Sequence, residues 1–363
     1  MGNNKQRRSI DEETIDKVVS NFSRDFIEKI PGDPRKTARS YAKRIVEPYF
    51  SPSISEDLRK MMLEYRLSDE DYLKTFFKIF SHTYYGKDVS DNPRAFILLS
   101  QTGGGKSNLR ERILRENPNV VLLDSDSYKR FRPDSMKIQQ QYPQFYGALT
   151  GIDSYDHLEN ISRYTMQNGY DFLIESAPSV SQGVIGVNLV ELEQLDYGID
   201  YDALAIGDVV SQMAVHKRYE EMLRDDLLRD SAKLTDIDRH NDSYSAVVLV
   251  LQNSSSNSKI VVYRRGTDME DRVPQVIESD DAKESKIETL EEYRRRSNEE
   301  YLTSHQFARD YNEVKRMMDE RQAPEIQRVQ LESVLQNAKL RATQINSNQI
   351  CNIETEIEED IDF

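Results

Sequence analysis

The sequence predicts an α/β fold in which a mostly parallel sheet is flanked by helices, with helical extensions at both ends of the chain. Two observations support this prediction. Between residues 91 and 265 short apolar runs alternate with segments of helical character, an order typical of βαβ units and a parallel sheet. On either side of that region the pattern is helical, apolar and periodic before it and highly charged after it.

Residues 1–90 are expected to form an N-terminal helical region. Asp11 can cap its first helix, and the segments Pro31–Pro34 and Pro48–Pro52 interrupt the pattern. We interpret its apolar stripes as core packing. They are Ile15, Val18, Val19, Phe22, Phe26 and Ile27, then Leu58, Met61, Met62 and Tyr65, then Tyr72, Phe76, Phe77, Ile79 and Phe80, with a further helix over residues 37–45.

Residues 91–268 are expected to form the α/β core. Its short apolar runs are interpreted as strands. They are Ala95–Leu99, Val120–Leu123, Phe172–Ile174, Ala203–Ile206 and Ala246–Leu251. The last run is expected to form a hairpin with Lys259–Tyr263, because the polar stretch Asn253–Ser258 between them is rich in turn-forming residues.

Residues 269–346 are predicted to be a charged helical extension, with Pro324 in the first turn of its last helix. Residues 347–363 form an acidic tail, which is expected to be solvated and disordered. Its acids are Glu354, Glu356, Glu358, Glu359, Asp360 and Asp362.

Composition narrows the possible partners and the compartment. The 363 residues carry a net charge of −15, which argues against a nucleic-acid-binding protein. No apolar run approaches the roughly 20 residues that a membrane helix needs, so we expect no membrane association. The single cysteine, Cys351, cannot form an intramolecular disulfide and fits a cytoplasmic protein.

The strongest motif is Phe96–Ser107, where an apolar strand leads into a glycine cluster and then a helical stretch. Gly103, Gly104 and Gly105 would let backbone N–H groups turn toward phosphate oxygens. Lys106 would contact the β- and γ-phosphates of ATP or GTP, and Ser107 would bind Mg²⁺. This arrangement predicts a P-loop NTPase or kinase. Ser100 replaces the first glycine of the usual pattern, and a chance glycine-rich turn is the alternative.

Two carboxylates follow the next strand. Asp124 and Asp126 come directly after Val120–Leu123, at the strand end where open parallel sheets bind ligands. A kinase acting on a hydroxyl needs a carboxylate to accept the proton, and either residue could do so. The alternative is an Asx turn that ends the strand.

Further charged residues could complete such a site. Glu175 ends the strand Phe172–Ile174 and could orient a substrate or a metal-bound water. Arg218, Arg229 and Lys233 lie on helix-like sequence, where a cation could stabilise the charge of phosphoryl transfer. For each of them the alternative is an ordinary solvated side chain.

These segments resemble the zeta toxin family, P-loop kinases of bacterial toxin–antitoxin systems. The resemblance covers roughly residues 92–265, and four stretches carry it. They are Gly103–Arg110, Asp124–Pro133, Gly169–Glu175 and Arg218–Met222. It implies an ATP- or GTP- and Mg²⁺-dependent kinase that phosphorylates a hydroxyl of UDP-N-acetylglucosamine and so inhibits cell-wall synthesis.

The same resemblance implies roles for individual residues. Asp126 would be the general base, with Asp124 and Glu175 binding the nucleotide sugar. Arg218 would be the first arginine that stabilises the transition state. The second cation would be Lys233 or Arg229.

The sequence departs from the family after Glu175, where Ser176–Ser179 lacks the expected arginine. This departure leaves open a kinase of the same fold acting on another nucleotide or dinucleotide. The altered phosphate loop, with Ser100 in place of glycine, and the acidic helical ends leave open a non-catalytic nucleotide-binding regulatory protein. The N-terminal region could restrain the enzyme in cis, as a separate antitoxin would, or could be a scaffold bundle.

Overall fold

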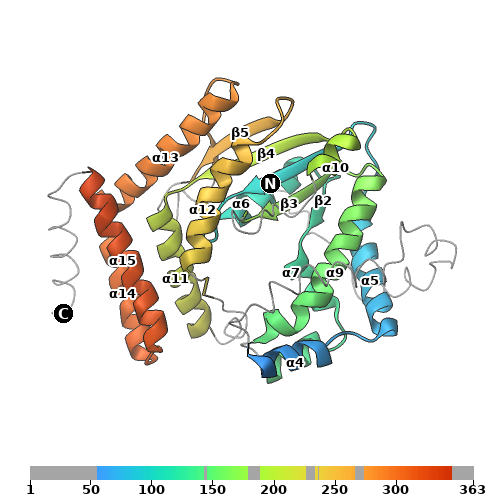
Figure 1. The fold of residues 1–363 in the computed structure, drawn as a ribbon, viewed down its shortest axis with the longest axis horizontal. Helices are drawn as coiled ribbons and strands as arrows, with labels where there is room; N and C mark the ends of the chain where they lie inside the picture. Colours follow the sequence, from blue (N-terminus) through green and yellow to red (C-terminus); the bar gives the residue numbers. More distant parts are fainter. Residues whose placement is uncertain are drawn as a thin grey trace, which may run out of the picture. The chain divides into compact units, whose positions relative to one another are not determined.

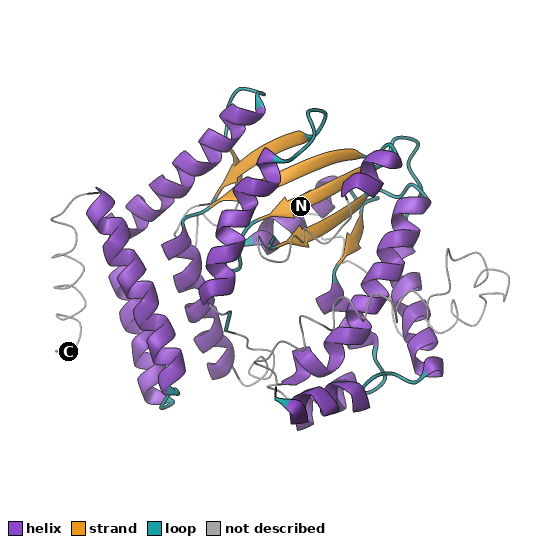
Figure 2. Cartoon of the chain, in the orientation of Figure 1, coloured by secondary structure: helices purple, strands orange, loops and turns teal. Residues whose placement is uncertain are grey.

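The computed structural model describes residues 55–142, 145–178, 189–225, 234–235, 237–265 and 274–345 (Figure 1). The chain forms two compact units, one of residues 1–91 and 119–172, the other of residues 92–118 and 173–363. Figure 2 shows helices and strands in both. The helices expected before residue 55 and the acidic tail lie outside the described residues.

The first unit is mainly helical. Its elements are α4 (Glu56–Glu64), α5 (Asp69–Tyr84), β2 (Val121–Leu123), α7 (Ser125–Tyr128), the 3-10 turn η1 (Lys129–Phe131), α8 (Ser135–Gln141) and α9 (Tyr146–Gln167). Ser55 and Ser68 cap α4 and α5 through their hydroxyl oxygens. Met62 of α4 is fully buried with Leu149 and Ile152 of α9, so its predicted role in the core is confirmed.

Buried ion pairs tie the loop after α4 to α9 in this unit. Arg66 contacts Asp153 at 2.9 Å and Asp156 at 2.7 Å, and Arg132 contacts Asp153 at 2.6 Å. Both aspartates are almost fully buried. Removing Arg66 would leave the buried Asp156 without the arginine that pairs with it, a change that typically costs about 3–5 kcal/mol.

The second unit contains a mostly parallel sheet. Its strands are β1 (Arg94–Leu99), β3 (Phe172–Ser176), β4 (Gly198–Ala205), β5 (Lys259–Arg264) and β6 (Gln275–Val276), in the order β3-β1-β4-β5-β6. Strands β1, β4 and β5 pair in parallel, and β6 is antiparallel to β5. Almost every residue of β1 and β4 is buried, so both faces of these strands are covered. The predicted fold class is confirmed.

Two strand predictions need correction. Residues 246–251 belong to helix α12 (Ile237–Gln252) and do not form a strand, so the predicted hairpin is wrong. Ser243, Val247 and Leu251 are buried while Leu249 is exposed, a helical period that a short apolar run conceals. Strand β4 begins at Gly198, earlier than predicted, because Asp200 and Asp202 interrupt the apolar pattern although both are buried.

Helices make up the rest of the second unit. They are α6 (Lys106–Glu116), α10 (Leu189–Gln194), α11 (Asp208–Arg224), α13 (Lys283–Thr303), α14 (Gln306–Glu320) and α15 (Glu325–Ile345). Helix α6 packs against β1, and α13 packs against β4 and β5. The predicted charged extension is helical in α13, α14 and α15, while β6 lies before them. Pro324, predicted in the first turn of the last helix, directly precedes α15.

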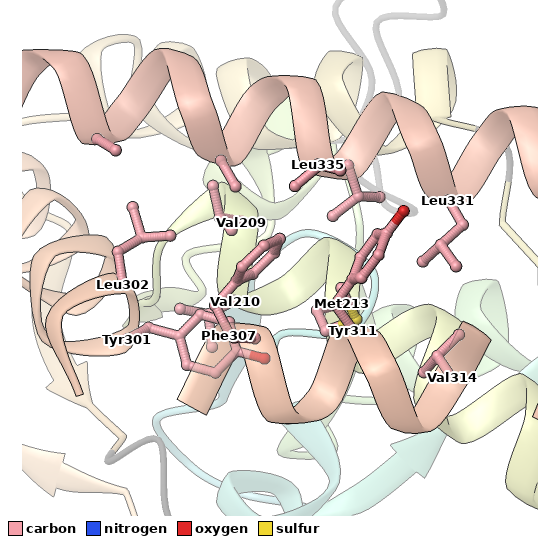
Figure 3. Close-up of a cluster of buried hydrophobic side chains, with 14 of the residues drawn as sticks. Val209, Val210, Met213, Tyr301, Leu302, Phe307, Tyr311, Val314, Leu331 and Leu335 are labelled. Atoms are coloured by element: carbon pink, nitrogen blue, oxygen red, sulfur yellow. The ribbon is translucent and has the colours of Figure 1, made fainter. Parts of the chain in front are cut away.

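One apolar cluster joins α11 to the last helices of the chain (Figure 3). Val209, Val210 and Met213 of α11 lie beside Phe307 and Tyr311 of α14, all of them buried. Leu331 and Leu335 of α15 close the cluster. Helix α11 is thereby held by α14 and α15. None of the helices in the described part of the chain is long and apolar enough to cross a membrane.

Candidate active site

The loop between β1 and α6 has the backbone of a phosphate cradle. Gly103 and Gly105 have φ angles of +79° and +88°, in the left-handed region that only glycine adopts readily. A Cβ atom on Gly103 would collide with the Ser211 carbonyl, and one on Gly105 would collide with the Arg265 guanidinium. The loop, residues 100–107, therefore follows a path that other residues would block, and it ends at the N-terminus of α6, which attracts anions.

Lys106 is the first residue of α6 and bends back over this loop. Its Nζ donates hydrogen bonds to the carbonyls of Ser100 at 2.8 Å and Gln101 at 3.0 Å. Burial lowers the pKa of Lys106 to about 8, although the Glu175 carboxylate acts in the opposite direction. The ammonium thus lies in a poorly hydrated position, where an anion would stabilise its charge.

Gln101 anchors the loop to the segment at the start of α11 through buried hydrogen bonds. It is fully buried, and its Nε2 donates to the Ile206 carbonyl at 3.0 Å and to Ser211 Oγ at 2.9 Å. His240 contacts the same hydroxyl at 2.9 Å through Nε2. Burial lowers the pKa of His240 to about 4, so its ring is neutral near pH 7. Apart from the position of Gln101 in the motif, no sequence pattern indicates this network.

A cavity of about 720 Å³ opens above the loop and lies entirely within the second unit. Among the described residues four cations line it, namely Lys106, Lys217, Arg218 and Arg265. Arg218, predicted from the sequence, is therefore brought to the phosphate loop. Arg265 directly follows β5 and was missed, because an arginine after a strand has no distinguishing pattern.

Helix α14 contributes acids to the same cavity. Lys217 Nζ contacts Asp310 Oδ1 and Glu313 Oε2, each at 2.7 Å. Both acids line the cavity. Burial opposes the charged form of Lys217, but the hydrogen bonds from these two carboxylates hold its pKa above the usual range. The Lys217 ammonium is therefore held by two carboxylates of α14, whereas the neighbouring Arg218 is exposed and lines the cavity.

Glu175 lies at the end of β3, as predicted, and lines the cavity. Its carboxylate pairs with Arg110 of α6 at 2.9 Å. The segment after it is held by Arg239 of α12, which donates to the carbonyls of Ala177 at 2.6 Å and Pro178 at 3.0 Å. Arg239 of α12 thus reaches the stretch after Glu175, in which the arginine expected from the family resemblance is missing.

Asp124 and Asp126 belong to the first unit. Asp124 is the N-cap of α7, and its Oδ1 accepts a hydrogen bond from the Asp126 N–H at 3.0 Å. The Asp126 side chain is 75% exposed and pairs with Lys129 at 2.5 Å. The Asx turn offered as the alternative for Asp124 is present. The role of Asp126 as a base facing the phosphate loop stays a prediction.

The remaining predicted cations, Arg229 and Lys233, lie outside the described residues. In the described part of the chain no three His, Cys, Asp or Glu side chains converge to hold a metal ion. Magnesium usually needs few protein ligands when substrate phosphates complete its shell. The Ser107 hydroxyl, in the first turn of α6 and beside the cavity, could supply such a ligand.

Comparison with known proteins identifies relatives of this chain. The zeta toxin family matches residues 82–272, more than half of the chain. Toxin zeta of Enterococcus hirae is 27% identical over 144 residues, 39% of this chain and 49% of that protein. Toxin PezT of Streptococcus pneumoniae is 25% identical over 138 residues, 38% of this chain and 54% of that protein. The chain therefore spans about half the length of the curated relatives it matches.

A solved structure shares the fold. It was described as part of the PezAT chromosomal toxin–antitoxin system of Streptococcus pneumoniae. The match has a TM-score of 0.54 and 20% sequence identity, and it covers 69% of this chain and 98% of that one.

Proposed function

This chain belongs to the zeta toxin family, and from that premise we propose that it is an ATP- or GTP- and Mg²⁺-dependent kinase that phosphorylates a hydroxyl of UDP-N-acetylglucosamine. As a toxin of this kind it would inhibit cell-wall synthesis. The observation that carries the proposal is the glycine cradle with Lys106 over it, in a cavity lined by further cations. Such a cradle fits the triphosphate of a nucleotide, because a glycine loop at a helix N-terminus and several cations border one space.

The residues of the site divide the work of the reaction. The nucleotide supplies the phosphoryl group when it is bound. Lys106 and the loop amides hold its phosphates, and Ser107 holds Mg²⁺. Asp126 accepts the proton of the acceptor hydroxyl, with Asp124 and Glu175 orienting the acceptor. Arg218, together with Arg229 or Lys233, stabilises the negative charge on the transferred group.

The proposal is tested with γ-labelled ATP, Mg²⁺ and UDP-N-acetylglucosamine. We expect label on the sugar nucleotide with the wild-type protein and none with Lys106→Met or Asp126→Asn. Lys74→Met is the matched control, because Lys74 is an exposed lysine that pairs with Glu70 of its own helix. If wild-type protein binds ATP but transfers label to no acceptor, the protein is a nucleotide-binding regulator rather than a kinase.

A second candidate differs only in the acceptor. Arg239 holds the carbonyls of Ala177 and Pro178 next to Glu175, an arrangement that could select another nucleotide or a dinucleotide. In the same assay, label on such an acceptor and none on UDP-N-acetylglucosamine would favour this candidate. The Arg239→Lys variant should then change KM for the acceptor more than kcat, because lysine cannot hold two carbonyls in the same fork geometry.

We further propose that the N-terminal residues act on the kinase as an antitoxin would. Residues 55–84 should stay in any test, because α4 and α5 belong to the core of the first unit through Met62 and Arg66. Deleting residues 1–54 should raise kinase activity and deepen growth arrest in cells that express the protein. Unchanged activity would count against restraint in cis and leave a separate antitoxin as the partner to seek.

A further inference from the structure

A second cavity of about 640 Å³ lies between α12, α13 and α15 of the second unit. It shares no lining residue with the cavity above the phosphate loop. Helices α13 and α15 both lie beyond residue 272, outside the stretch that matches the family. This cavity is thus built mainly by the part of the chain for which the proposed kinase mechanism has no use.

The cavity contains a buried arginine whose hydrogen-bonding capacity is only partly used. Arg294 is 2% exposed and lies over the Tyr244 ring, with its guanidinium carbon 4.1 Å from the ring centroid. Its Nη1 donates to the Tyr244 carbonyl at 3.0 Å. Nε and Nη2 have no hydrogen-bond partner among the described residues. Leaving a buried donor unsatisfied is unfavourable, and more so when the group is charged.

The two unsatisfied nitrogens form the edge of the guanidinium that binds carboxylates side-on. The same edge binds carboxylates elsewhere in the described part of this chain, and two examples show the geometry. Arg321 contacts Glu220 through Nε at 2.6 Å and Nη2 at 2.7 Å. Arg132 contacts Asp134 through the same two atoms at 2.9 Å and 3.1 Å. Arg294 has the same edge without a hydrogen-bond partner among the described residues, and its side chain lines a cavity.

The other charged residues that line the cavity are arginines already paired with acids, or an acid, which would repel an anionic ligand. Arg341 is bound to Asp208, and Arg295 is bound to Glu292 and to Glu299. Glu291 also lines the cavity, and it raises the pKa of Arg294 against the lowering that burial causes. None of the described residues donates or accepts a hydrogen bond at the unsatisfied edge, and a bound carboxylate would do so.

The rest of the lining is apolar in part. Val248 and Leu249 of α12 and Ile345 of α15 line the cavity, and Leu249 is 42% exposed. A ligand that carries both an anion and a hydrocarbon chain would satisfy Arg294 and cover these side chains. Hydrocarbon burial contributes about 25 cal/mol per Å², so the chain would add to the affinity.

We propose that this cavity is a carboxylate-binding site, in which Arg294 holds the two oxygens through Nε and Nη2 and an attached hydrocarbon chain packs on Val248 and Leu249. Both nitrogens are buried in the structure, so the proposed binding includes a rotation of the Arg294 side chain toward the cavity. The carboxylate has two possible sources. One is a small free carboxylic acid, and the other is the acidic segment 354–362 of this chain, which follows Ile345 closely in sequence.

The test is calorimetric titration of the full-length protein with sodium octanoate. We expect binding to wild type, at least tenfold weaker binding to Arg294→Lys, and no binding to Arg294→Met. Lysine keeps the charge but loses the side-on edge. Arg296→Met is the matched control, because Arg296 lies on the same helix but pairs with Glu292 and does not line the cavity. Arg341 is unsuitable for the test because it also holds Asp208 at the start of α11.

Octanamide provides a measurement that needs no variant. It has the same chain without the charge, and it should bind wild type at least tenfold more weakly than octanoate. Equal binding of the two compounds, or octanoate binding that survives Arg294→Met, would overturn the proposal. Octanoate binding should persist in Lys106→Met, which separates this site from the kinase proposal.

A second protein distinguishes the sources of the carboxylate. This variant of the full-length chain has glutamine in place of four acids, Glu354, Glu356, Glu358 and Glu359. Octanoate binding to wild type identifies a site for free acids. Binding only after the replacements identifies the acidic segment as the natural occupant. The absence of binding to both proteins refutes the site.

Discussion

Nucleotide affinity should fall as the pH rises through 8, because Lys106 loses its proton in that range. Burial lowers the pKa of Lys106 to about 8, with Glu175 raising it and Arg218 and Arg239 lowering it further. Bound phosphates favour the charged ammonium, so nucleotide binding is coupled to proton uptake above this pKa. Affinity is therefore retained below the pKa and lost above it.

The size of the effect follows from the protonated fraction of Lys106. With a pKa of about 8, about nine tenths of the side chains are charged at pH 7 and about one tenth at pH 9. If only the charged form binds, the dissociation constant rises about tenfold, or about 1.4 kcal/mol. The nucleotide does not contribute, because phosphate groups have their second pKa near about 6. His216 and His240 do not contribute either, since burial lowers the pKa of each to about 4.

The assay is equilibrium titration with a fluorescent ATP analogue across this pH range, without an acceptor. Lys106→Arg is the control, because a guanidinium stays charged throughout and should remove the pH step. Lys217 should not produce a step, since its pKa is raised. A wild-type affinity that does not change with pH, or a step of the same size in Lys106→Arg, would refute the reasoning.

Three further outcomes are expected. Gly103→Ala should abolish nucleotide binding, because the added Cβ would collide with a backbone carbonyl. Gly86→Ala is the control, since Gly86 has a φ of +66° but open space around it. It should lower the free energy of unfolding in urea by only about 1 kcal/mol and leave nucleotide binding unchanged. Arg321→Met should lower the free energy of unfolding by about 3 kcal/mol, because it leaves the buried Glu220 without its bidentate partner. A decrease of less than about 1 kcal/mol would contradict this expectation. Lys129→Met should move the acidic limb of the pH profile of kcat/KM to higher pH, because Asp126, the proposed base, loses the cation that favours its charged form. A limb at the same pH in wild type and variant would argue against Asp126 as the base.

The fold could be predicted where sequence pattern and burial agree. β1 is a continuous apolar run, and it lies in the centre of a parallel sheet with both faces covered. The prediction failed at residues 246–251, where a short apolar run has no readable period and belongs to α12. It fell short at β4, where Asp200 and Asp202 look like loop residues. There Arg94 pairs with Asp200, and Asp202 hydrogen-bonds Tyr263, contacts that no local pattern contains.

The site could be predicted only for residues that carry a local signal. The phosphate loop was readable because its function requires glycines and a lysine in adjacent positions. Arg265 and the α14 acids could not be predicted, since each reaches the cavity from a distant element. The same holds for Arg239, which reaches the carbonyls of Ala177 and Pro178 from α12. Gln101 lies inside the motif, yet its bonds to Ile206 and Ser211 depend on the start of α11.

The sequence by itself determined the chemistry near the end of β1, because a backbone that turns around phosphate needs glycine at fixed positions and this need is local. It also determined the alternation of strands and helices, which follows from hydrophobic period. Only the tertiary structure decided which cations share the cavity, which acids restrain Lys217, and which buried arginine keeps an unsatisfied edge. These properties depend on distances between residues far apart in the chain, and those distances arise only when the helices pack.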